Sequence, residues 1–150
     1  MSSPPFVRVL VVEDFEPFRR FIHTTLQETE LQVVGEAWDG LEAVRKAEEL
    51  QPALTLLDIG LPSLNGIEAA RRIRKLAPES KILFLSLESS PDVVEEALSV
   101  GAMGYVVKAH AASELLAAVE AVCRGRQFVS GLALGLPSVF AGNERAITQA

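Results

Sequence analysis

The stretch Leu54-Thr55-Leu56-Leu57-Asp58 decides how this chain is interpreted. Four apolar or β-branched residues precede the aspartate, and the run lies between Pro52 and the turn residues Gly60 and Pro62. A short apolar run of this kind is typical of a buried strand in a parallel sheet. Asp58 would then stand at the carboxyl end of the strand, where ligands bind in open α/β sheets. It could cap the following turn, or it could act as a nucleophile or metal ligand, and this stretch alone leaves both roles open.

The composition fits one globular domain. The chain has 150 residues, of which 49% are hydrophobic and 23% charged, with a net charge of −6. This length suffices for a full core, and the absence of a long basic run argues against nucleic-acid binding by this chain alone. One cysteine, Cys123, rules out an intrachain disulfide. No apolar run approaches the roughly 20 residues that span a bilayer. We therefore expect a cytoplasmic protein with no membrane partner.

Strand and helix patterns alternate five times along the chain. Strands are predicted at residues 6–12, 31–38, 54–58, 81–86 and 104–108, and helices at about 15–29, 41–50, 66–76, 91–100 and 113–124. Because the connections are too long for hairpins, the pattern predicts an α/β fold, a doubly wound five-stranded parallel sheet with helices on both faces. Gly35 and Glu36 interrupt the second strand and place it near an edge, and Ser113 is expected to cap the last helix. Residues 127–150, broken by glycines and a proline, are predicted to be a tail or linker.

The predicted helix at 66–76 carries a basic pattern that has two explanations. Arg71, Arg72, Arg74 and Lys75 could bind phosphate. However, an apolar stripe that includes Ile73 runs between these charges at helical spacing. This spacing favours a solvated helix face over a binding site.

Polar residues follow four of the five predicted strands directly. They are Glu13 and Asp14 after the first strand, Asp58 after the third, Ser86 after the fourth and Lys108 after the fifth. The carboxyl ends of parallel strands share one edge, so three carboxylates, a hydroxyl and an ammonium should converge. Two like charges about 4 Å apart repel by roughly 4 kcal/mol at an effective dielectric of 20, and one lysine cannot balance three carboxylates. Mg²⁺ takes oxygen ligands and keeps positions open for phosphate oxygens. The site is therefore suited to transferring a phosphoryl group onto a carboxylate.

With these residues in place, the chain resembles the receiver domain of two-component response regulators. The resemblance covers about Phe6 to Arg124 and implies a flavodoxin-like or CheY-like fold with strand order 2-1-3-4-5. Further matches are Pro62 and Gly66, four and eight residues after the aspartate, and Tyr105, three residues before the lysine. The segment from Gly101 to the lysine is similar to the NarL/FixJ-type subgroup. The resemblance thus places a receiver domain at residues 1–125 and a tail or linker at 126–150.

The resemblance implies a role for each residue of the cluster. Asp58 would be the phosphoacceptor, with Ser86 and Lys108 acting on the phosphoryl group. Glu13, Asp14, Asp58 and the backbone carbonyl of Gly60 would hold Mg²⁺, and Ser86 and Tyr105 would form a switch. Glu88, near the site, would tune dephosphorylation. The chain would catalyse only its own phosphorylation and dephosphorylation, and so would not be an enzyme in the ordinary sense.

The implied partners follow from the same resemblance. The phosphoryl donor would be a sensor histidine kinase or a phosphotransfer protein. The output would be homodimer formation or partner binding through the face built from the fourth helix, fifth strand and fifth helix. Members of the NarL/FixJ-type subgroup usually continue into a helix-turn-helix DNA-binding domain, for which the 25 residues from Arg126 are too few.

One departure from the family pattern and three alternatives remain at this point. Ala109 stands where many receivers have proline, which leaves the isomer of the Lys108–Ala109 bond undecided. The chain could be the regulatory half of a truncated transcription regulator, or an interaction module that is never phosphorylated. A haloacid-dehalogenase-type phosphatase is disfavoured, because such enzymes have a second aspartate where Gly60 stands here.

Overall fold

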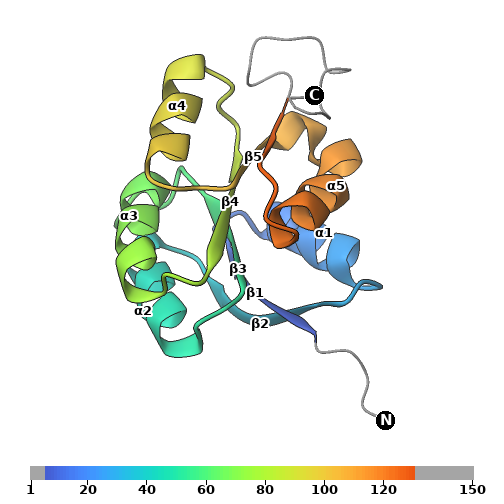
Figure 1. Cartoon of the computed structure of the whole chain (residues 1–150), viewed down its shortest axis with the longest axis horizontal. Helices are drawn as coiled ribbons and strands as arrows, with labels where there is room; N and C mark the ends of the chain where they lie inside the picture. Colours follow the sequence, from blue (N-terminus) through green and yellow to red (C-terminus); the bar gives the residue numbers. More distant parts are fainter. Residues whose placement is uncertain (1–5, 131–150) are drawn as a thin grey trace.

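The computed structural model describes residues 6–130, which form one parallel sheet with helices on both faces (Figure 1). The strands are β1 (Val7–Val12), β2 (Leu31–Ala37), β3 (Leu54–Asp58), β4 (Lys81–Ser86), β5 (Gly104–Val107) and β6 (Phe128–Val129). Their order is β2-β1-β3-β4-β5-β6, and every neighbouring pair is parallel. The predicted doubly wound fold and the order 2-1-3-4-5 are confirmed, with β6 added beyond β5. β2 lies at an edge, as its interrupted pattern predicted.

The helices divide into two layers. They are α1 (Glu16–Leu26), α2 (Gly40–Leu50), α3 (Gly66–Leu76), α4 (Pro91–Ser99) and α5 (Ala111–Cys123), with a 3-10 turn η1 (Lys108–His110) after β5. α1 and α5 cover one face of the sheet, and α2, α3 and α4 cover the other (Figure 1). Each layer buries its own cluster of apolar side chains against the sheet. Among these helices none is long and apolar enough to cross a bilayer.

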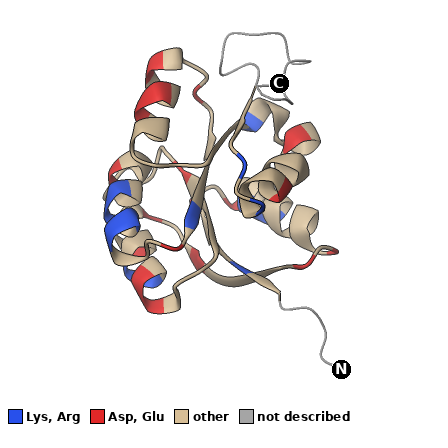
Figure 2. Ribbon diagram, viewed as in Figure 1, with Lys and Arg blue, Asp and Glu red and all other residues tan. Residues whose placement is uncertain are grey.

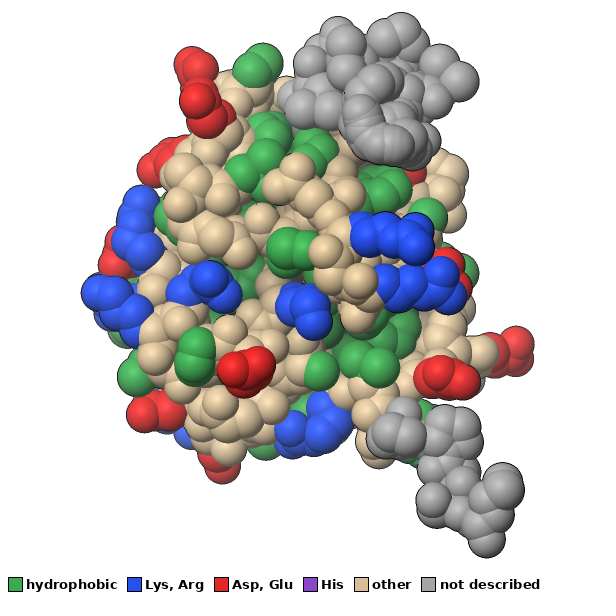
Figure 3. All heavy atoms as spheres, in the orientation of Figure 1, with side chains coloured by type: hydrophobic (Ala, Val, Ile, Leu, Met, Phe, Trp, Pro, Cys, Tyr) green, Lys and Arg blue, Asp and Glu red, His purple; other side chains and the backbone are tan. Residues whose placement is uncertain are grey.

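Helix α3 shows why its basic pattern is a solvated face. Ile67, Ala70 and Ile73 are buried against the sheet, and the arginine and lysine side chains between them are exposed. Figure 2 shows basic residues coloured along the ribbon of α3, and Figure 3 shows basic side chains on the flank of the molecule where this helix lies. Arg71 and Arg72 pair with Glu68 on the same helix, at 2.7 and 3.3 Å. The structure thus favours the solvated-face explanation of the pattern.

The structure differs from the sequence predictions in two local features. Helix α5 begins at Ala111, so Ser113 lies within its first turn, where the hydroxyl donates to His110 O at 3.1 Å instead of capping the helix. A strand was also missed in the segment predicted to be a tail or linker, where Phe128 N donates to Met103 O at 3.1 Å and pairs with the open edge of β5. The rest of that segment, residues 131–150, lies outside the described residues.

Ser130, the residue after β6, forms hydrogen bonds that join this segment to β5. Its backbone N donates to Tyr105 O at 2.9 Å, and its hydroxyl accepts from Val107 N at 3.0 Å. The same hydroxyl donates to Glu114 of α5 at 2.5 Å. Ser130 is fully buried, so these bonds satisfy its hydroxyl and backbone N–H and connect the segment to the strand that leads to Lys108.

Candidate functional site

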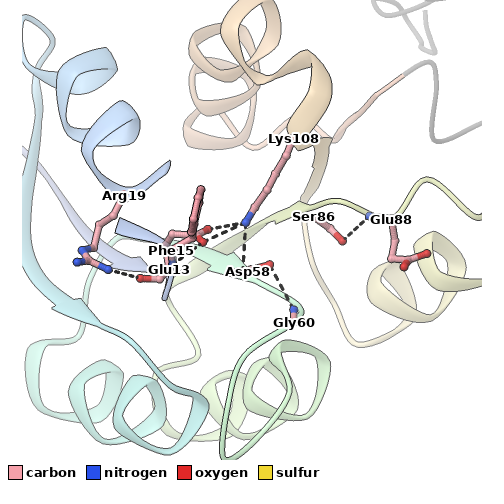
Figure 4. Close-up of polar contacts among 8 residues, drawn as sticks. All are labelled: Glu13, Phe15, Arg19, Asp58, Gly60, Ser86, Glu88 and Lys108. Carbon is pink, nitrogen blue, oxygen red and sulfur yellow. Dashed lines mark hydrogen bonds and ion pairs between the residues drawn. The ribbon is translucent and has the colours of Figure 1, made fainter. Parts of the chain in front are cut away.

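Three strands bring one ammonium between two buried carboxylates (Figure 4). Lys108 follows β5, Glu13 follows β1 and Asp58 ends β3. Lys108 Nζ lies 2.8 Å from Glu13 Oε1 and 3.3 Å from Asp58 Oδ2. The exposed fractions of the lysine, glutamate and aspartate side chains are 10%, 1% and 9%. The structure therefore gathers the predicted charges, although they are far apart in the sequence, and it excludes most water from them.

The carboxylates outnumber the lysine. One carboxylate oxygen from each of Glu13, Asp14 and Asp58 lies within 4.8 Å of the others. Burial raises the pKa of Glu13, and repulsion from Asp58 raises it further, while Lys108 and the Phe15 amide lower it. Glu13 Oε1 is buried and accepts no hydrogen bond of good geometry within residues 6–130, although the lysine ammonium is close. An all-oxygen, carboxylate-rich group with this excess of negative charge fits a hard divalent cation such as Mg²⁺.

The loop after β3 holds Asp58 by its backbone. Gly60 N donates to Asp58 Oδ1 at 3.3 Å, and Gly66 N donates to Ile59 O at 2.7 Å. A Cβ at Gly66 would stand 2.0 Å from Asp58 O, so only glycine allows this approach of α3 to the strand end. A Cβ at Gly60 would meet no atom within 4 Å. The contact of Gly60 with Asp58 is thus made by its amide, and the metal-binding role of its carbonyl stays a prediction.

Ser86 lies beside the carboxylates but is bonded elsewhere. Asp58 is paired with Leu85 across β3 and β4, which puts Ser86 at the same edge of the sheet. The buried Ser86 hydroxyl accepts from Glu88 N at 3.0 Å (Figure 4), and no hydrogen bond within residues 6–130 joins it to Asp58. The structure therefore places Ser86 next to the charged group without engaging it.

Tyr105 connects to Ser86 through Glu88. Its ring is fully buried on β5, 6.3 Å from the ring of Phe84, and its hydroxyl donates to Glu88 O at 2.8 Å. Burial raises the pKa of the Tyr105 phenol. The backbone of Glu88 thus bonds to both residues, because its carbonyl accepts from the Tyr105 hydroxyl and its N–H donates to the Ser86 hydroxyl. Residues 6–130 contain no cis peptide bond, so Lys108–Ala109 is trans.

Two side chains that contact the site were not predicted to do so. Arg19 donates to Glu13 O at 2.9 Å, and its guanidinium lies 4.7 Å from the ring centroid of Trp38. Phe18, on the same helix, has its ring centroid 4.7 Å from Lys108 Nζ. The available signal was proximity, because both residues lie in the first turns of the helix that follows the acidic pair Glu13-Asp14 directly.

The sequence comparison decides the family. The model of the response regulator receiver domain family matches residues 9–120. The chain belongs to this family. The receiver is 40% identical over 124 residues to the transcriptional regulatory protein PdtaR of Mycobacterium tuberculosis, covering 82% of this chain and 60% of the relative. It is 32% identical over 114 residues to the chemotaxis protein CheY of Listeria monocytogenes, covering 76% of this chain and 96% of the relative.

Solved structures agree with this family. The receiver superimposes on the signal receiver domain of NarL from M. tuberculosis with a TM-score of 0.77 at 32% identity, covering 82% of this chain and all of that one. A LuxR-family two-component response regulator from Aurantimonas gives a TM-score of 0.73 at 34% identity, with 81% and 88% of the two chains covered. NarL- and LuxR-family regulators are thus among the relatives of this receiver, which belongs to two-component signalling.

The relatives differ in how much chain lies beyond the receiver. The matched part is 52% of the transcriptional regulatory protein DegU of Brevibacillus brevis and 60% of PdtaR, but 96% of the Listeria CheY. The chain therefore spans about half to three fifths of the transcriptional regulators that it matches.

Proposed function

We propose that this receiver accepts a phosphoryl group on Asp58 from a sensor histidine kinase or a phosphotransfer protein, in a reaction that needs Mg²⁺. The observation that carries the proposal is the unbalanced charge at the sheet edge. One buried ammonium, Lys108, lies between two buried carboxylates, and a third carboxylate oxygen, from Asp14, is within 4.8 Å of theirs. A purely structural ion pair needs no such excess of negative charge, whereas a cation-dependent phosphoryl acceptor does.

The chemistry assigns one task to each group. Glu13, Asp14, Asp58 and the Gly60 carbonyl would hold Mg²⁺, which when bound neutralises charge on the phosphoryl oxygens. An Asp58 oxygen attacks the phosphorus in line, so that an O–P bond forms while the P–N bond to the donor imidazole breaks. The Lys108 ammonium then donates to a phosphoryl oxygen. In this proposal the chain promotes only its own phosphorylation and dephosphorylation.

The switch follows from the bonds of Ser86. The Ser86 hydroxyl accepts from Glu88 N, and Glu88 O is the acceptor for the Tyr105 hydroxyl, so a movement of Ser86 toward a phosphoryl oxygen would be passed to Tyr105 through Glu88. In this proposal the phosphoryl group favours the conformation in which Ser86 is drawn inward and the buried Tyr105 ring fills the space beside it. The group shifts the populations of two states only by its different contacts in each. Glu88, two residues after Ser86, is also proposed to tune dephosphorylation.

The output surface is the face formed by α4, β5 and α5, through which a second copy or another partner would bind. Here the outer edge of β5 is paired with β6, so any partner at this face meets Phe128 and Val129 as well. The lengths of the transcriptional regulators support a second candidate, in which this receiver is the regulatory half of a DNA-binding protein. In either case the receiver by itself is proposed to act on proteins and not on nucleic acid.

Intact mass after incubation with acetyl phosphate and Mg²⁺ tests the proposal. We expect one added phosphoryl group on the native chain, its loss when Mg²⁺ is omitted, and no addition to Asp58→Asn. Asp92→Asn, which removes an exposed carboxylate from the first turn of α4, is the matched control and should label normally. Labelling of Asp58→Asn at another residue would contradict the assignment. A native chain that neither labels nor binds Mg²⁺ would favour a phosphorylation-independent interaction module.

A further inference from the structure

The ammonium of Lys108 is bounded on two sides. Glu13 and Asp58 face it on one side, and the ring of Phe18 lies on another, with its centroid 4.7 Å from Nζ. A lysine ammonium has three N–H donors, and the contacts with the two carboxylates account for only part of this capacity. The negative face of an aromatic ring within about 6 Å attracts a cation, more strongly where water is excluded. The Lys108 side chain is 10% exposed and Phe18 is half-buried, so most water is kept from this contact.

We propose that Phe18 is a positioning residue for phosphoryl transfer. The face of its ring attracts the Lys108 ammonium and keeps it beside the Asp58 carboxylate. This inference rests on the proposed function. Lysine has a flexible four-carbon chain, and it must exchange a carboxylate oxygen for a phosphoryl oxygen during the reaction. The ring contact involves neither oxygen and therefore persists through the exchange. An aliphatic side chain of similar size would fill the space but would not attract the cation.

Phe18 is well placed for this role because its own position does not depend on the lysine. Its half-buried ring packs on Phe21 one turn away, at a centroid distance of 5.2 Å, and both rings lie against the apolar cluster that α1 and α5 form on the sheet. The start of the same helix also holds the glutamate, because Phe15 N donates to Glu13 Oε2 at 3.1 Å. The first turn of α1 thus positions both the Glu13 carboxylate and the Phe18 ring against Lys108, although this lysine follows β5, far away in the sequence.

The first experiment detects the contact in metal-free protein. The methylene protons beside the lysine ammonium should be shifted upfield by the ring current of Phe18, in a protein labelled at its four lysines. Lys108→Arg assigns the signal. We expect the upfield shift to be lost in Phe18→Leu and kept in Phe21→Leu. Phe21 is the matched control, since it lies on the same helix and against the same apolar cluster, and leucine at this position keeps an apolar side chain beside the ring of Phe18.

The second experiment measures the rate of Mg²⁺-dependent labelling by acetyl phosphate. Phe18→Leu should slow labelling by about tenfold, as expected for loss of a water-excluded cation–π contact, and Phe21→Leu by no more than about twofold. Phenylalanines of increasing fluorination at position 18 keep the shape of the ring and weaken its negative face. The rate should therefore fall stepwise along this series, which also guards against a Phe18→Leu variant that folds poorly.

Three results would overturn the inference. Equal rates along the fluorinated series, or equal losses in Phe18→Leu and Phe21→Leu, would show that the ring only packs. Absence of the upfield shift in the native chain would show that the contact is not populated. If the native chain labels while any of these results is found, only the role of Phe18 fails. If the native chain cannot be labelled by acetyl phosphate or by a kinase, the proposed function fails and the role of Phe18 fails with it.

Discussion

The two ends of the sheet treat buried polar groups differently. At the amino ends, Thr55 of β3 and Ser80 before β4 are both buried, uncharged, and hydrogen-bonded to each other at 2.8 Å. At the carboxyl ends, Glu13 and Asp58 are buried, charged, and share a single lysine. At the amino ends, the two hydroxyl groups therefore satisfy each other's hydrogen-bonding needs. The carboxyl ends keep an excess of charge, which lowers the stability of the isolated domain and leaves room for a cation or an anionic group.

Of the substitutions that test this difference between the two ends, removal of the Lys108 ammonium should have the largest effect on stability. Lys108→Met leaves two buried carboxylates without their cation, and we expect the free energy of unfolding to fall by about 3 kcal/mol at pH 7. Urea denaturation measures the loss, and added Mg²⁺ should recover part of it. Lys81→Met, at the amino end of β4, has no ion pair within the part of the chain described and should change stability by less than about 0.5 kcal/mol. Equal effects of the two substitutions would contradict the difference between the ends.

Backbone packing at the carboxyl end should be the next most sensitive feature. Gly66→Ala forces a Cβ against Asp58 O, where 2.0 Å is available, and should destabilise the fold by about 2 to 3 kcal/mol. Gly60→Ala, in the same loop but with open space around it, should change stability by less than about 0.5 kcal/mol. Thermal unfolding of both variants checks this, and a stable Gly66→Ala would show that α3 can move away from Asp58.

Substitutions in the hydroxyl pair Thr55 and Ser80 at the amino end should lower stability by a smaller amount. Thr55→Val or Ser80→Ala alone leaves one buried hydroxyl without its partner and should cost about 1 to 2 kcal/mol. The double variant should cost less than the sum of the two, because it leaves neither group unpaired. Urea denaturation of the four proteins gives the coupling energy. Labelling of Asp58 should be unchanged throughout, and a change would mean that the two ends are coupled.

The smallest expected effect is a pH dependence at the charged end. Burial raises the pKa of Glu13, so between the ordinary glutamate pKa and this raised value the folded chain binds a proton that the unfolded chain has lost. Stability contributed by this group must therefore fall as pH rises through that window. Compared with Glu13→Gln, the native chain should lose stability as pH increases above about 4.3. Denaturation curves of both proteins from pH 4 to 8 measure the difference, and the opposite slope would mean that Lys108 outweighs burial.

Local patterns predicted most of the fold. The bounds of β3, α3 and β4 were predicted to the residue, because each combines a clear apolar pattern, continuous in the strands and at helical spacing in α3, with turn residues on both sides. The prediction failed where the deciding contact is remote. The two-residue strand β6 has no periodicity of its own and forms only because β5 presents an open edge.

The sequence by itself determined which strand-end polar residues meet at the candidate site, since parallel strands share one edge and each of these residues follows or ends a strand. It could not determine how they engage one another. Only the tertiary structure placed Ser86 on Glu88 N, the ring of Phe18 over Lys108, and Ser130 between β5 and α5. The physical reason is separation along the chain: Phe18 and Lys108 lie ninety residues apart. Contacts at that range depend on packing angles and rotamers, which leave no periodic trace in the sequence.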